Sequence, residues 1–136
     1  MPDTFKLEIV TPQAIVFEED VEMVTLPAIE GEMGVYAHHA RLITQLVPGE
    51  IAVNKAGADR FLAVGEGLVE VAGDHVSIVT DMAIPAEQID EHTIEEARAR
   101  AEARLREKLS DEEVASVNAS LVRSLAQLKV KRRRGA

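Results

Sequence analysis

The chain has 136 residues, enough for one ordinary domain with a small appendage; 46% of them are hydrophobic but only 3% are aromatic. The absence of cysteine excludes disulfides and thiolate metal sites. Residues 1–88 hold 4 Lys/Arg and 15 Asp/Glu, a net charge of −11, which argues against nucleic-acid binding because phosphates would be repelled. No signal peptide is recognised and no apolar run reaches the roughly 18 residues that cross a bilayer, so we expect a soluble chain.

Short runs of alternating apolar residues fill the chain up to Pro85. In the first run Phe5, Leu7 and Ile9 share one face, with Lys6 and Glu8 on the other. Further strands are predicted at 21–26, 42–47, 50–54, 60–64, 67–73 and 75–80, separated by turn signals such as Pro48-Gly49 and Gly73-Asp74. The acidic segment 18–20 is expected to form a solvated turn. The pattern predicts an antiparallel β-sandwich or barrel of roughly 80 residues, and the lack of crossover helices excludes a parallel α/β fold.

The hydrophobic period becomes helical after Pro85. Thr93 and Glu96 have the spacing of a capping box, and Asp90 is a competing N-cap. The expected apolar stripe of this first helix consists of Ile94, Ala97, Ala101, Leu105 and Leu109.

A second capping box at Ser110 and Glu113 predicts a second helix that follows with almost no linker. Its expected stripe consists of Val114, Val117, Leu121, Leu125 and Leu128. The predicted fold is therefore α+β: an N-terminal antiparallel β-sandwich over 1–86, followed by an antiparallel two-helix hairpin over 87–136. The first stripe is rich in alanine and buries little apolar area, so we expect the hairpin to hold its position weakly.

No catalytic, cofactor or metal site is predicted. The segment Gly31-Glu32-Met33-Gly34 lacks the phosphate-loop pattern and places carboxylates where phosphate would bind. His38 and His39 are adjacent and face opposite ways on an extended segment, and none of the four histidines has metal-ligand spacing. No local arrangement marks a nucleophile.

The stretch LPAIEGEMGVYAHHARLITQLVPG (26–49) resembles the signature of the epsilon subunit of F-type ATP synthases. The resemblance extends over the whole chain: it includes the opening FKLEIVTPQAIVFEEDVEMVTLP, the block 64–83, Ile89-Asp90 at the start of the helices, and LAQLKV (125–130). It departs from the family at His38, which replaces a small residue, and at Ala37 and Arg41, where prolines are common.

The resemblance implies a non-catalytic rotor subunit, one copy per complex, at the cytoplasmic face of the bacterial plasma (inner) membrane. Its sandwich would lie between the gamma subunit and the c-ring, touching the membrane only through that ring, and would couple ring rotation to ATP synthesis on the alpha and beta subunits. Gly31 and Gly34 would let a tight loop present Glu32 and Met33 outward, and His39 matches a family histidine. Glu32, Met33 and His39 are thus expected to lie exposed at one end of the sandwich and to bind gamma and the c-ring; the alternative for Met33 is a side chain tucked under the loop.

The resemblance also implies a regulatory role for the hairpin, which in the family can extend along gamma and obstruct ATP hydrolysis. Five cations follow Leu128, past the last clear helical turn: Lys129, Lys131, Arg132, Arg133 and Arg134. We expect this basic tail to contact an acidic segment of the beta subunits and to favour the extended state. The alternative is a disordered tail without a role.

Some bacterial relatives bind ATP between the helices through arginines. Here Thr93 and Gln127 stand at two of the arginine positions, and only Arg123 matches. Each lost charge-assisted contact is worth roughly 1.5–3 kcal/mol, so the isolated chain is predicted not to bind ATP at physiological concentration.

Two other classes of function stay open on the sequence alone. One is an acidic β-sandwich adaptor that binds an unrelated protein through its hairpin; the other, with less support, is an enzyme. Co-purification would separate them, since a rotor subunit is pulled down with gamma and the catalytic subunits.

Overall fold

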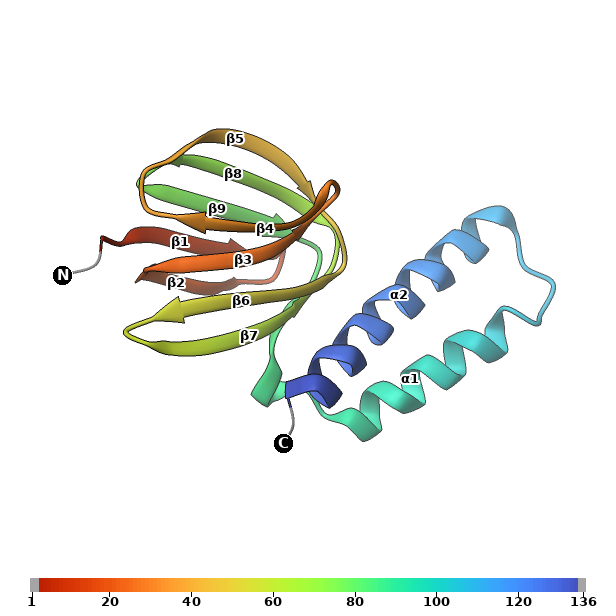
Figure 1. Ribbon diagram of the computed structural model, residues 1–136. Helices are drawn as coiled ribbons and strands as arrows, with labels where there is room; N and C mark the ends of the chain where they lie inside the picture. Colours follow the sequence, from red (N-terminus) through yellow and green to blue (C-terminus); the bar gives the residue numbers. More distant parts are fainter. Residues whose placement is uncertain (1–2, 135–136) are drawn as a thin grey trace.

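The computed structural model describes residues 3–134 as a β-sandwich followed by two helices (Figure 1). The strands are β1 (Phe5–Val10), β2 (Ile15–Val21), β3 (Met23–Ala28), β4 (Gly31–Tyr36), β5 (His39–Leu46), β6 (Gly49–Lys55), β7 (Ala58–Val64), β8 (Gly67–Gly73), β9 (His75–Thr80) and β10 (Ala83–Pro85). The helical elements are the 3₁₀ turn η1 (Ala86–Gln88), α1 (Glu91–Arg104) and α2 (Asp111–Arg134). The predicted fold class is confirmed.

The strands form one sheet in the order β10-β7-β6-β3-β5-β8-β9-β1-β2, with β4 paired to β3. Neighbouring strands are antiparallel except β1 and β9, which run parallel with Leu7 opposite Val76. The prediction that 18–20 is a turn was wrong, because these residues lie in β2, where Glu18 pairs with Glu8. Figure 1 shows the sheet folding over on itself, and the half that contains β1 and β9 faces the half that contains β3 and β6.

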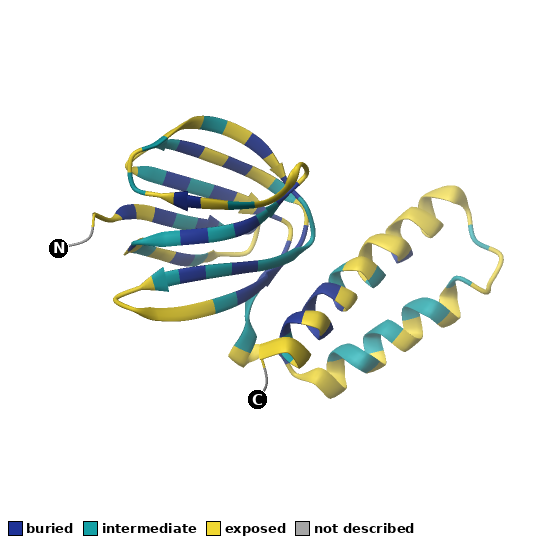
Figure 2. Ribbon diagram, in the orientation of Figure 1, coloured by how far each residue is buried: buried dark blue, intermediate teal, exposed yellow. Residues whose placement is uncertain are grey.

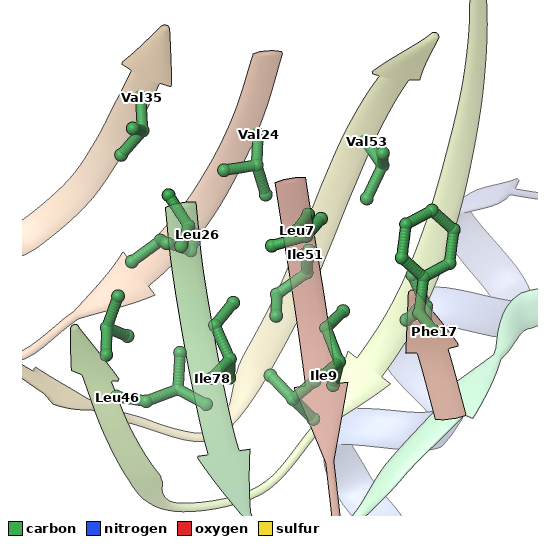
Figure 3. Packing of buried hydrophobic residues seen from close by; sticks show 14 of the residues in the cluster. Leu7, Ile9, Phe17, Val24, Leu26, Val35, Leu46, Ile51, Val53 and Ile78 are labelled. Atoms are coloured by element: carbon green, nitrogen blue, oxygen red, sulfur yellow. The ribbon is translucent and has the colours of Figure 1, made fainter. Parts of the chain in front are cut away.

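The core lies between the two halves of this folded sheet. Phe5, Leu7 and Ile9 are buried, as the alternation in the first strand predicted. Figure 3 shows Leu7 and Ile9 of β1 lying close to Ile51 of β6. The cluster is built mainly of Val, Ile and Leu, whose branched side chains suit a pleated surface. The packing of this sandwich fixes the positions of the strand residues discussed below.

Helix α1 begins after Asp90, whose Oδ1 accepts hydrogen bonds from the backbone N–H groups of His92 and Thr93 at 3.1 and 3.3 Å. The competing N-cap therefore starts the helix, and Thr93 does not cap it. The helix ends at Arg104, so the stripe predicted to run on to Leu109 is too long. Residues 105–110 form a connector, and the prediction of almost no linker was wrong.

The second capping box is confirmed. Glu113 N–H donates to Ser110 Oγ at 3.1 Å, and Ser110 N–H donates back to Glu113 Oε1 at 3.1 Å. Helix α2 then continues to Arg134, so the five terminal cations are helical and do not form a tail beyond the last turn. Of the predicted stripe, Val117 and Leu128 are buried, whereas Leu125 is exposed.

The hairpin is attached to the sandwich through the C-terminal half of α2, from Arg123, which lies 3.5 Å from Asp81, to Arg134. Val130 of α2 joins Ala63 of β7, Met82 and Ile89 in a small second core, with Ile94 of α1 packed against it. From this base the two helices project away from the sheet, and their far halves are largely exposed (Figure 2). No helix among residues 3–134 has the length and apolar character needed to cross a membrane.

Candidate docking surfaces

The described residues hold no cluster suited to a metal ion: nowhere in 3–134 do three or more His, Cys, Asp or Glu side chains gather in a way that could hold one. The surface features that remain are one strand hairpin, a row of helical cations and an exposed apolar face. Each is a candidate for binding another macromolecule.

The segment predicted to be a tight loop is strand β4. Gly31 has a φ of 123°, which favours glycine, and from there the chain pairs back along β3, with Glu32 opposite Pro27 and Tyr36 opposite Met23. Glu32 is exposed, as predicted. Met33 is half-buried and packs against the main core, so the prediction that it is presented outward was wrong. The strand period explains this placement, because successive residues point to opposite faces.

His39 lies at the other end of the sandwich from Glu32. Strand β4 runs along the sheet between them, and an extended strand rises by about 3.3 Å per residue. His39 begins β5, is half-buried, and its Nδ1 lies 2.8 Å from the carbonyl oxygen of Ala40. Its neighbour His38 is exposed, adopts a φ of 64° and lies 3.2 Å from Asp3. The structure therefore does not bring Glu32, Met33 and His39 onto one end.

Two of the five helical cations make specific contacts. Arg134 donates from Nε and Nη2 to the two carboxylate oxygens of Glu50 on β6, at 2.8 and 2.5 Å. Its guanidinium also lies over the ring of Phe61 on β7, 3.9 Å from the centroid. Arg132 donates to Glu91 at 2.6 Å and to Glu95 at 2.9 Å, both on α1.

The carboxylates raise the pKa of both arginines above its ordinary value, chiefly through the side-chain hydrogen bonds to Glu50 and to Glu91. These arginines therefore stay charged throughout the accessible pH range.

Lys129, Lys131 and Arg133 form no ion pair with any described residue, and Lys129 and Arg133 face the sandwich side. These last two line a cleft of about 390 Å³ between the end of α2 and the sandwich, together with Pro27, Glu32 and Pro48. Glu32 and these two cations, which the sequence analysis assigned to separate roles, thus share one cleft.

An exposed apolar face lies on the outer side of the sheet, and the sequence analysis did not single it out. Leu68 of β8 is paired with Val79 of β9, Val79 with Val10 of β1, and Val10 with Ile15 of β2. Leu68, Val79 and Ile15 are 58%, 55% and 60% exposed, and Ile43 of β5, which lies diagonal to Leu68, is 68% exposed. Contiguous apolar side chains on an outer face are typical of a protein-binding surface.

A row of carboxylates borders this apolar face. Glu70 is paired with Ile43, and in the same row of the sheet Glu8 is paired with Glu18. Ser77 lies between Glu70 and Glu8. A partner that matches this surface would bring apolar side chains flanked by cations. This apolar face could have been predicted from the alternating pattern of β8 and β9, because Leu68 and Val79 occupy outward positions where polar residues are expected.

Two family profiles match the chain in succession. The family described as "ATP synthase, Delta/Epsilon chain, beta-sandwich domain" matches residues 4–86, and "ATP synthase, Delta/Epsilon chain, long alpha-helix domain" matches residues 87–132. The boundary between them falls at η1, where the structure changes from strand to helix.

Bacterial proteins named ATP synthase epsilon chain are similar over nearly the whole length. That of Herpetosiphon aurantiacus is 38% identical over 125 residues, which is 92% of each chain. That of Shouchella clausii is 37% identical over 98% of each chain, and that of Dehalococcoides mccartyi is 41% identical over 95% of this chain and 93% of its own.

Two solved structures contain chains that are similar to this one in fold. A chain of the Euglena gracilis mitochondrial ATP synthase OSCP/F1/c-ring assembly matches with a TM-score of 0.76 and 26% identity, over 95% of this chain and 81% of that one. A chain of the Tetrahymena thermophila mitochondrial ATP synthase central stalk/c-ring matches with a TM-score of 0.59 at 14% identity, which is a likeness of fold alone.

Proposed function

This chain belongs to the delta/epsilon family of ATP synthase chains, and on that premise we propose that it works as a non-catalytic subunit in the rotating central stalk of a bacterial F-type ATP synthase. The observation that carries the proposal is the consecutive match of the sandwich and the helices, with relatives named ATP synthase epsilon chain over nearly the full length. The family match does not favour an unrelated adaptor.

In this role the chain transmits torque and carries out no reaction of its own. Proton flow turns the c-ring, the sandwich turns with it together with the gamma subunit, and gamma drives ATP synthesis on the alpha and beta subunits. The sandwich (1–86) docks and the hairpin (87–136) regulates; residues 1–2 and 135–136 of these ranges lie outside the described part. The chain is a peripheral subunit at the cytoplasmic face of the plasma (inner) membrane, held there through the c-ring.

The separation of Glu32 from His39 divides the docking role between two places. We assign the gamma subunit to the apolar face around Leu68 and Val79, with His39 at the edge of the same β5–β8 pair. The c-ring is assigned to the end of the sandwich that carries Glu32. Exposed apolar area supports the first assignment, because burying it at about 25 cal/mol per Å² stabilises a permanent interface.

The cations that make no internal ion pair supply the regulatory contact. Lys129 and Arg133 project from the last turns of α2 and are available to an acidic segment of the beta subunits. Lys131, which also forms no ion pair with a described residue, keeps this role, whereas the contacts of Arg132 and Arg134 within the chain give those two another role.

Cysteine crosslinking in the assembled enzyme tests the docking assignments. Leu68→Cys is expected to crosslink to gamma and Glu32→Cys to the c-ring. Ala58→Cys serves as the control and is expected to remain unlinked. Ala58 is exposed and is the first residue of β7, next to the β6–β7 turn. If Leu68→Cys and Glu32→Cys link to neither subunit, the docking assignments are wrong; if the chain does not co-purify with gamma and the catalytic subunits, the proposed function fails as well.

A further inference from the structure

The attachment of the hairpin to the sandwich offers little apolar surface. Helix α1 has no buried residue at all, and the part of α2 that is buried against the sandwich is concentrated between Ser124 and Val130. Alanine and polar side chains make up four of the seven residues of that stretch, which includes Ala126 and Gln127. An interface of this kind releases little free energy by burial, so additional contacts decide how firmly it stays closed.

Arg134 supplies such a contact between the last turn of α2 and the sheet. Its bidentate pair with Glu50 joins residues 84 positions apart, and the two side chains are only 28% and 16% exposed. The ring of Phe61 covers the guanidinium from the sheet side. Planar, bidentate and partly desolvated pairs are stronger than ordinary surface ion pairs, and a cation over an aromatic ring adds to them.

Arg132 supplies a second contact, between α2 and the first two turns of α1. Its guanidinium reaches both Glu91 and Glu95, which are four residues apart on one face of α1. The same turn of α2 is thereby tied to α1 through Arg132 and to the sheet through Arg134. All three parts of the molecule meet at this point, which is the closed base of the hairpin.

We propose that Arg134 is an arginine latch that holds the hairpin closed against the sandwich, so that releasing Arg134 from Glu50 and Phe61 opens it, while Arg132 ties α2 to α1 within the hairpin. This direction is opposite to the role that the sequence analysis assigned to these two cations, because their partners lie in the closed molecule. The latch is a property of the chain itself and does not depend on the assembly.

The chain contains its own matched control. Arg133 is adjacent to Arg134, lies in the same helical turn and carries the same charge, yet forms no ion pair with any described residue. Replacing Arg133 or Arg134 by glutamine removes the same charge from the same region. Only the Arg134 variant removes the contacts with Glu50 and Phe61.

Opening can be measured by thiol labelling of the full-length chain. The sequence has no cysteine, and Val130 is 1% exposed in the small core, so Val130→Cys reports opening of the base without interference from other thiols. In this background we expect Arg134→Gln and Glu50→Gln each to raise the labelling rate about three- to tenfold. Arg133→Gln is expected to leave it nearly unchanged.

Two further measurements fix the interpretation. In the double variant Glu50→Gln/Arg134→Gln the rate should be no higher than in the faster single variant, because both remove one interaction. Hydrogen exchange of β8 and β9 should be unchanged, which shows that the sandwich stays folded. An equal effect of Arg133→Gln, multiplication of the two single effects, or no acceleration in either single variant would each overturn the latch.

Discussion

At the residue scale, Asp90 determines where the hairpin begins. Its carboxylate accepts the N–H groups of Thr93 and His92, and these hydrogen bonds, Thr93 first, lower the pKa of Asp90 below its ordinary value of 3.8. The folded pKa is the lower one, so the stabilisation is complete above 3.8 and is lost as the pH falls through the folded pKa.

We therefore expect the first turn of α1 to lose its cap in acid, below pH 3.8. Asp90→Asn keeps an oxygen acceptor that does not titrate, so the Thr93 amide signal in nuclear magnetic resonance should lose its acid-dependent shift while α1 stays helical at neutral pH. Asp90→Ala should fray the turn at every pH. Identical acid titrations of the Thr93 amide in the original chain and in Asp90→Asn would contradict the assignment.

A second prediction at this scale concerns ATP. Arg123, the one matching arginine, lies 3.5 Å from Asp81, and Gln127 is buried with its amide directed at the sulfur of Met82. Arg123 is therefore already paired with a carboxylate, and Gln127 and Thr93 carry no charge that could bind the phosphates of ATP. Calorimetry on the isolated chain should show no ATP binding at physiological concentration; a dissociation constant in the micromolar range would contradict this.

At the scale of the elements, the close approach of β8 and β9 requires a glycine. A Cβ built at Gly67 would lie 1.9 Å from the backbone oxygen of Val79 and 2.8 Å from the Cα of Thr80. Gly67 is paired with both Thr80 and Leu46, so the three strands β5, β8 and β9 are held together at this residue.

Gly67→Ala is therefore expected to lower the free energy of unfolding by about 2–3 kcal/mol, because backbone must move to admit the methyl group. Gly34→Ala is the control: its Cβ would meet only the terminal methyl of Met23, a flexible side chain, at 3.1 Å, and should cost less than about 1 kcal/mol. Urea denaturation measures both. Equal losses in the two variants would show that the close approach at Gly67 is not the cause.

Strands with strict alternation, such as 67–73 and 75–80, could be predicted because their register follows from burial of one face. Strand β4 was not predicted, because two glycines and Glu32 within four residues are typical of a loop. Pairing with β3 nevertheless makes the segment extended. The end of α1 was misplaced because Leu105 and Leu109 continue the helical spacing, yet both lie in the connector, far from the sandwich, and are only half-buried. Periodicity records which residues could share a face, and tertiary contact decides whether they do.

At the scale of the whole molecule, the candidate site depends on contacts that sequence spacing does not contain. The pairing of Arg134 with Glu50 follows from the packing of α2 on β6 and β7, and the separation of Glu32 from His39 follows from the extended course of β4 along β3. Family resemblance supplied the class of protein. Resemblance could not show which cations already form ion pairs within the chain, because Arg133 and Arg134 are adjacent residues of the same type in the sequence.

The parallel pairing of β1 with β9 also sets an order of events during synthesis. Leu7 finds its partner Val76 only after nearly the entire sandwich has left the ribosome, and contacts so distant in sequence form slowly. Adjacent hairpins such as β1–β2 and β6–β7 can form earlier, but the β1–β2 hairpin then has no sheet to join until β9 is made. The nascent N-terminal strand, with Phe5, Leu7 and Ile9 still uncovered, is thus the segment for which a chaperone has the longest time to compete.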